Sequence, residues 1–237
     1  AAAAENGYAL AYMAPELRGT LDREVVLAAV AQDGHALMYA SAELRRNREV
    51  ALAAVQQNGR ALEYAEMRAD REVVLAAVTQ NGQALYWASA ELQGDRDVVL
   101  AAVTQNGDAL NFAPAQLKGD RELMLAAVAR NGFVLRFASA EVRGDKEVVL
   151  AAVTQNGRAL EYASETLKGD REVVLAAVTQ TGHSLNKASV EMRRDREVVL
   201  AAVAQDMSMP LECASAQLWR DREALLAEAE VLKSLGP

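Results

Sequence analysis

A nine-residue motif, Asp-Arg-Glu-Val-Val-Leu-Ala-Ala-Val, begins at Asp70 and recurs at Asp170 and Asp195. Its first residue, Asp or Asn, marks a register that repeats every 25 residues through most of the chain. The marker positions are Asp22, Asn47, Asp70, Asp95, Asp120, Asp145, Asp170, Asp195 and Asp221. A unit this short cannot bury its own apolar face, so neighbouring units must stack and share a core. The register therefore predicts about nine stacked units.

Each unit carries helix signals in a fixed order. The marker residue is a good N-cap, and an acidic residue follows in the first turn. About ten residues later, a pair such as Asn106-Gly107 predicts the helix end, with the glycine in the left-handed conformation. A second short helix follows, and then a Ser or Pro that starts a one-turn helix. The expected fold is all-α, an α-solenoid of about nine 25-residue helix-pair repeats with a short one-turn helix in the connector.

Insertions and deletions are confined to the connector between units. The unit that ends at Asp70 lacks two residues there, and extra residues stand at Thr20-Leu21 and around Pro210. We expect residues 1–220 to form the tandem repeats, with the first repeat truncated because residues 1–6 match the end of a first helix. Residues 221–237, with leucines alternating with charged residues, are expected to form a C-terminal capping helix.

Composition excludes several classes of function. The net charge of -8 disfavours phosphate backbones, so we expect no nucleic-acid partner. Apolar runs such as 173–178 are too short to cross a bilayer, although attachment to a membrane complex stays open. The single cysteine, Cys213, excludes an internal disulfide framework and fits a reducing intracellular compartment, such as cytoplasm or organelle stroma.

No constellation in the sequence is typical of an active site. His35 and His183 occupy the same place in repeats six periods apart, too distant to share a metal, and we expect both to be exposed. The repeated carboxylates are explained by helix capping, and each following Arg is placed to bridge to the next repeat. Cys213 falls at a position expected in the core. We therefore predict no catalytic residue, no metal, no cofactor and no enzyme activity.

Comparison of the repeats with one another separates conserved positions from variable ones. The positions after the glycine and after the Leu of the second helix vary most, and their spacing of three places them on one face. A solvated face without function is the simpler alternative. Exposed aromatic residues, Met and Arg nevertheless favour a protein-binding stripe. Its candidate residues are Tyr8, His35, Met38, Tyr86, Phe133, Arg136 and Lys187.

Lys187 is a candidate because it interrupts a column of aromatic residues. The column stands two residues past the Leu of the second helix and includes Tyr64, Trp87 and Phe137. Core packing is the first explanation of such a column. A lysine at this position would reach for solvent, where a partner can dock.

The segment Asp-Lys-Glu-Val-Val-Leu-Ala-Ala-Val-Thr-Gln-Asn-Gly-Arg-Ala-Leu-Glu-Tyr-Ala-Ser, which starts at Asp145, resembles the uncharacterised repeat family DUF4116. The resemblance covers essentially the whole chain. It implies an all-helical tandem array, found mostly in algae, other protists and some of their associated microbes. It implies no established activity or cofactor.

Three classes of function remain as hypotheses. The first is a non-catalytic protein–protein interaction scaffold, for example an accessory subunit of a larger organellar or photosynthetic assembly. The second is a helical-repeat RNA reader, which would use two side chains per repeat, although the acidic charge opposes it. The third, an enzyme, lacks any supporting cluster of residues.

Overall fold

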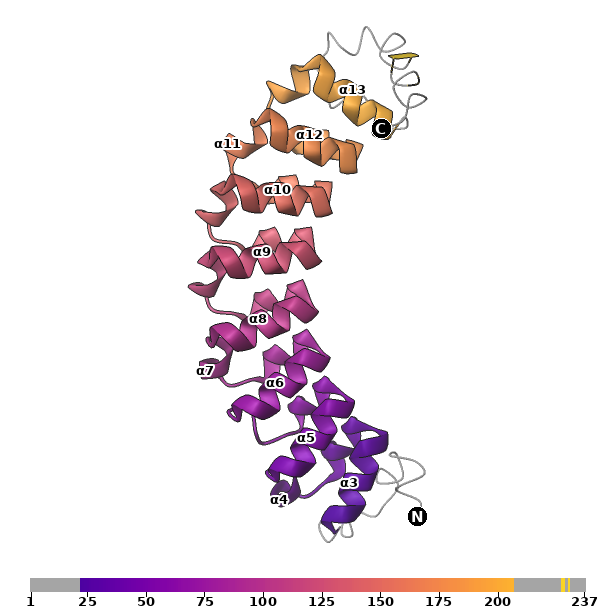
Figure 1. The fold of residues 1–237 in the computed structure, drawn as a ribbon, viewed down its shortest axis with the longest axis vertical. Coiled ribbons are helices and arrows are strands. Elements are labelled where there is room, and N and C mark those ends of the chain that lie inside the picture. Colours follow the sequence, from indigo (N-terminus) through magenta and orange to yellow (C-terminus); the bar gives the residue numbers. More distant parts are fainter. Residues whose placement is uncertain (1–21, 207–226, 229, 231–237) are drawn as a thin grey trace. The chain divides into compact units, whose positions relative to one another are not determined.

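The structure is a computed structural model that describes residues 22–206, 227–228 and 230 (Figure 1). The chain divides into two compact units, unit 1 (Ala1–Leu117) and unit 2 (Lys118–Pro237). Each unit is a stack of repeats, as an α-solenoid requires, and each is described by itself. The candidate residue Tyr8, Cys213, the truncated first repeat, the insertions at Thr20-Leu21 and around Pro210 and most of the predicted cap lie outside the described residues.

Unit 1 contains ten-residue α-helices, each followed by a short 3₁₀ helix. The α-helices are α3 (Arg23–Gln32), α5 (Arg48–Gln57), α6 (Arg71–Gln80) and α8 (Arg96–Gln105). The 3₁₀ helices are η2 (Gly34–Tyr39), η3 (Gly59–Glu63), η4 (Gly82–Trp87) and η5 (Gly107–Phe112). The connectors hold one-turn helices α4 (Ala42–Arg45) and α7 (Ala90–Gln93), and η6 (Leu117–Gly119) spans the unit boundary.

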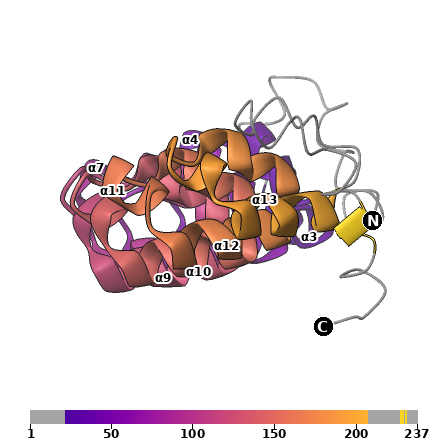
Figure 2. The ribbon, with the colours of Figure 1, turned by 90° about the horizontal axis from the view of Figure 1, so that it is seen from above.

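Unit 2 repeats the same order. Its α-helices are α9 (Arg121–Arg130), α10 (Lys146–Gln155), α12 (Arg171–Gln180) and α13 (Arg196–Gln205). The 3₁₀ helices that follow are η7 (Gly132–Phe137), η9 (Gly157–Tyr162) and η10 (Gly182–Lys187). Its connectors hold η8 (Val142–Gly144), α11 (Glu165–Lys168) and η11 (Met192–Arg194). In Figure 2, α9, α10 and α12 lie along one side of the unit, and α11 lies at its edge.

The ten-residue helices begin and end where the sequence predicts. In α6, the Asp70 carboxylate accepts hydrogen bonds from the backbone N–H groups of Glu72 and Val73, at 3.0 and 3.1 Å. Asn47 caps α5 by accepting from the Val50 N–H, which explains why Asn can replace Asp at this position. Pairs of adjacent residues, such as Val73 and Val74, are both fully buried, because the helix packs against a neighbour on either side.

The second helix of each repeat differs from the prediction. It is a tight 3₁₀ helix of five or six residues, and the expected left-handed glycine before it is wrong. Asn81 at the end of α6 is extended (φ -146°, ψ 106°), and Gly82 lies outside the left-handed region. Glycine is needed for space, since a Cβ on Gly82 would lie 2.3 Å from the carbonyl oxygen of Ala102 in the next repeat.

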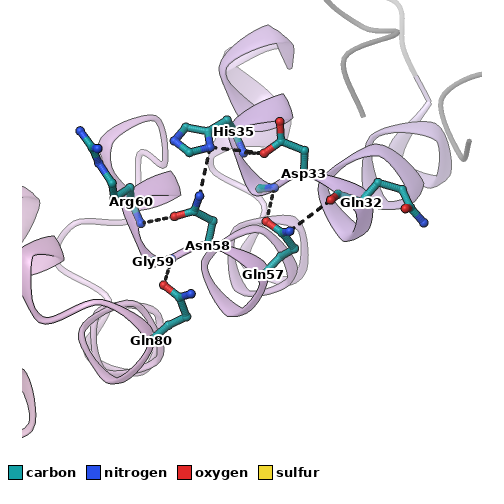
Figure 3. Close-up of polar contacts among 9 residues, drawn as sticks. Gln32, Asp33, His35, Gln57, Asn58, Gly59, Arg60 and Gln80 are labelled. Atoms are coloured by element: carbon teal, nitrogen blue, oxygen red, sulfur yellow. Dashed lines mark hydrogen bonds and ion pairs between the residues drawn. The ribbon is translucent and has the colours of Figure 1, made fainter. Parts of the chain in front are cut away.

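A glutamine fixes this close approach. The Gly82 N–H donates to Gln105 Oε1 at 2.6 Å, and the same bond joins Gly132 to Gln155. Gln57 accepts from the Gly34 N–H at 2.7 Å and donates from Nε2 to the carbonyl oxygen of Gln32 at 3.1 Å. One side chain therefore contacts both elements of the preceding repeat (Figure 3). The bonds satisfy backbone groups that would otherwise be buried without partners. We call this contact the glutamine rung.

Two further contacts join successive repeats. The Ser N-caps of the connectors are confirmed, as in Ser89, which accepts from the Leu92 N–H. The Ser89 N–H in turn donates to the carbonyl oxygen of Arg68 in the preceding connector, at 2.8 Å. At the other edge, the predicted arginine bridges are present. Arg71 contacts Asp95 at 3.2 Å and Asp97 at 3.0 Å in the next repeat.

A glycine at the start of a 3₁₀ helix, such as Gly132, and a glycine in a connector, such as Gly144, should differ in their tolerance of alanine. Gly132→Ala places a Cβ 2.3 Å from the backbone oxygen of Ala152, so we expect a loss of about 1–3 kcal/mol of unfolding free energy. In the same unit, a Cβ on Gly144 meets nothing closer than Ser164 Oγ at 4.0 Å, so Gly144→Ala should stay within about 0.5 kcal/mol of the wild type. Chemical denaturation of both variants measures this, and equal losses would contradict the close approach.

The capping aspartates should make stability depend on pH. The hydrogen bond from the Val98 N–H, aided by Arg71, holds the pKa of Asp95 below its ordinary value of 3.8. The pKa of Asp170 is lowered as well, and there the largest cause is the hydrogen bond from Lys146. A carboxyl whose pKa is lowered by folding stabilises the fold above its ordinary pKa. That contribution is lost as pH falls through the lowered pKa. The free energy of unfolding should therefore decrease from about pH 4 towards about pH 2.

The matched variant is Asp95→Asn, which keeps a capping acceptor as in Asn47 but removes the charge. We expect it to unfold with a smaller dependence on pH than the wild type, as measured by urea denaturation at several pH values. A stability that stays constant between pH 5 and pH 2.5 would contradict this account of the aspartates.

Candidate partner-binding face

The 3₁₀ geometry places the two variable positions on one side. Residues three apart in a 3₁₀ helix lie above one another, because each turn contains three residues. In η4, Ala84 and Leu85 point into the core and are fully buried, while Gln83 and Tyr86 are exposed. We call this outward side of the 3₁₀ helices the candidate face, and describe it for each unit.

In unit 1 the candidate face is rich in aromatic groups. Tyr86 is 59% exposed, although its ring meets Trp87 and Phe112 edge-on at centroid distances of 5.4 and 5.3 Å. Met38, also on the face, is 43% exposed. The Arg60 guanidinium lies over the Trp87 ring at 5.7 Å. Such a cation–π contact holds the arginine at the surface without neutralising its charge.

His35 belongs to a polar cluster at the edge of this face (Figure 3). Its Nδ1 lies 3.3 Å from Asp33 Oδ1 and 3.1 Å from Asn58 Nδ2, and its ring meets Tyr64 edge-on. His35 is thus half-buried, whereas the sequence predicted an exposed side chain. Burial, and then the charge of Glu63, raises the pKa of Tyr64.

In unit 2 the candidate face carries more charge. Phe133 is half-buried with its ring edge-on to Tyr162, and the Arg136 guanidinium lies 4.4 Å from the Phe137 ring centroid. Lys187 is exposed, as predicted, and contacts Glu161 at 2.8 Å. His183 is also exposed, with Nδ1 3.1 Å from Asp206. The two histidines therefore lie in different units with different neighbours.

The aromatic column is not in the core, contrary to the prediction. Tyr64, Trp87 and Phe137 are half-buried, and the fully buried places belong to the preceding Ala and Leu residues, such as Ala84 and Leu85. The column instead lines the side of the candidate face. Sequence reasoning therefore missed Trp87 as a member of the face, whereas Arg60 stands at the variable position after Gly59 that the sequence placed on it.

The candidate face offers rings, a thioether and cations, which bind by packing and hydrogen bonding. Among the described residues, no group of three or more His, Cys, Asp or Glu side chains is arranged to hold a metal ion. None of the described helices combines the length and the hydrophobicity that crossing a membrane requires.

Comparison with known proteins gives one match. The family described as Domain of unknown function (DUF4116) matches residues 22–68, 70–118, 120–168 and 170–223. Each match spans two of the 25-residue repeats, so the family unit is a pair of them. No curated protein and no solved structure matches the chain significantly. Because the four matches cover most of the chain, this protein belongs to the DUF4116 family of tandem helical repeats.

Proposed function

We propose that this protein is a non-catalytic scaffold that binds another protein through the candidate face. The observation that carries the proposal is the exposure of Tyr86 and Met38, at 59% and 43%. Both belong to residue types enriched in protein interfaces, and both stand at positions that the repeat leaves free. A protein of this kind serves as an accessory subunit in a larger assembly.

The roles of the surrounding residues support this proposal. Folding is explained by the buried Ala, Val and Leu residues, the glutamine rungs and the capping aspartates. Tyr86 contributes to none of these contacts, and its edge-on contacts with Trp87 and Phe112 leave 59% of it exposed. Arg60 over Trp87 adds a cation held against an aromatic ring, a pair typical of interface anchors.

The partner that these features favour is a protein, not a nucleic acid. The net charge of -8 repels phosphate at long range. Acidic Glu63 and Glu161 stand at variable positions of the face itself. An RNA reader would present donors and stacking rings there without such carboxylates.

The test is a quantitative pull-down with four forms of the tagged full chain. We expect proteins captured by the wild type to be lost from the variant with Tyr86, Phe133 and Arg136 all changed to Ala. Separate Tyr86→Ala and Phe133→Ala/Arg136→Ala variants assign the loss to unit 1 or unit 2. Because Tyr86 and Arg136 are exposed and Phe133 is half-buried, thermal unfolding should change little.

The matched control changes Thr79, Thr104 and Thr154 to Ala. These threonines are exposed near the ends of α6, α8 and α10, on the opposite element of the repeat. We expect the control to retain every partner of the wild type. If the triple variant of the candidate face also retains them all, the proposed scaffold function is wrong.

A further inference from the structure

Unit 2 contains a pocket of about 410 Å³ on its candidate face. Three successive repeats contribute to it: Phe133 from η7, Arg158 and Glu161 from η9, and residues of η10. The contribution of η10 consists of His183, Ser184, Asn186 and Lys187. The volume lies within the range of small-molecule sites, roughly 300–1,000 Å³. The pocket therefore has room for a small organic group.

The chain itself supplies a comparison for this pocket. The segment Asn-Gly-Arg-Ala-Leu-Glu-Tyr-Ala occurs twice without change, at residues 58–65 in unit 1 and at 156–163 in unit 2. In unit 1, the guanidinium of its Arg60 lies over Trp87 of the next repeat. In unit 2, the residue at the position of Trp87 is Lys187. Any difference between the two sites therefore comes from the neighbouring repeats, namely the one that precedes the segment and the one that follows it.

With Lys187 in the place of Trp87, Arg158 lacks the ring contact that Arg60 makes. Lys187 pairs with Glu161 at 2.8 Å, and it offers no ring to Arg158. Among the described residues, the guanidinium of Arg158 has no hydrogen-bond, ion-pair or ring partner. Arg158 is exposed at the pocket with all its donors available.

The base of the pocket also departs from the repeat pattern. Ser184 stands where other repeats carry Ala, such as Ala84 and Ala159, and it is only 2% exposed. Its hydroxyl has no hydrogen-bond partner among the described residues. A Cβ on Gly157 would lie 3.1 Å from that hydroxyl, whereas a Cβ on Gly132 would lie 3.0 Å from Gln155 Oε1. A buried hydroxyl without a partner is costly and uncommon, so Ser184 marks the junction of η9 and η10 as a departure from the repeat.

The repeat is altered in its cap as well. In η9, Asn156 accepts a hydrogen bond from the Arg158 N–H, but Thr181 at the start of η10 makes no side-chain cap. Thr181, Ser184 and Lys187 thus each replace a residue that stabilises the fold elsewhere. Their concentration around one pocket fits a place specialised for binding.

We infer that this pocket binds a single carboxylate attached to an apolar body, with Arg158 as the carboxylate-binding residue. A guanidinium matches a carboxylate in geometry and forms two parallel hydrogen bonds with it. The ring of Phe133 provides an apolar wall for the body of the ligand. Asn186 and His183 add polar groups at the rim.

The charges of the pocket favour one negative charge on the ligand. Glu161 lines the pocket beside Lys187, and Asp206 contacts His183 at 3.1 Å. These carboxylates oppose a phosphate or a second acidic group. Two sources supply the required chemistry, namely a free organic acid and the C-terminal carboxylate of a protein. The inference therefore names the chemical group that the proposed scaffold recognises in unit 2, but it requires no protein partner.

The test is a calorimetric titration of the full chain with N-acetyl-L-phenylalanine and with its neutral amide. We expect the acid to bind, and the amide to bind at least about tenfold more weakly, because hydrogen bonds to a charged group are the stronger ones. Arg158→Gln should weaken binding of the acid by a similar factor. Lys187→Trp should also weaken it, because it supplies the ring that engages the arginine in unit 1.

The matched control is Arg60→Gln, which changes the same residue in the identical segment and should leave the titration unchanged. Equal binding of acid and amide, no binding of the acid at millimolar concentration, or an unaffected Arg158→Gln variant would each overturn the inference. A second titration with N-acetyl-Ala-Ala-Phe identifies the source of the carboxylate. If the tripeptide binds more tightly than N-acetyl-L-phenylalanine, the ligand is a protein C-terminus. If the two bind equally, the ligand is a free organic acid. If the pull-down fails but the titration succeeds, only the proposed scaffold function is rejected.

Discussion

The close contact between each 3₁₀ helix and the next ten-residue helix determines the geometry of both units. At Gly82, the carbonyl oxygen of Ala102 occupies the space of a Cβ, and Gln105 accepts the glycine N–H. This contact sets the separation of neighbouring repeats and the direction in which the 3₁₀ helix leaves. Because the direction is set, the side chains after the glycine and after the leucine always emerge on the same side. The candidate face is a consequence of the rung.

Contacts between repeats are concentrated at three places. Arginine or lysine bridges join the starts of the ten-residue helices, glutamine rungs join their ends, and backbone bonds such as Ser164 to Arg143 join the connectors. Exposed ion pairs contribute little individually, so the bridges align repeats more than they hold them together. The buried Val, Ala and Leu residues between these places supply most of the stabilisation. The outward positions of the 3₁₀ helices are then free to vary.

The sequence was sufficient for the parts of the fold that depend on local signals. Capping by Asp70, the length of α6 and the Ser89 cap all follow from residue types at fixed positions. The 3₁₀ character of η4 could not be predicted in this way, because the close packing of Gly82 involves Ala102 and Gln105 of another repeat. The recurrence of Gln before most of the Asn-Gly pairs, at Gln57, Gln80, Gln105 and Gln155, was the available signal. The exposure of Tyr86 and Lys187 was predictable, whereas the pocket required knowledge of which repeats meet.

The two copies of the segment at 58–65 and 156–163 carry the same eight residues into different chemical settings. One arginine lies over an indole, and the other has no side-chain partner among the described residues, because the neighbouring repeats differ. In such an array the binding property belongs to the junction between units. Insertion of a copied unit between two others during evolution therefore creates two new junctions and removes an old one. New specificities can arise by reordering existing units, before any single residue has mutated.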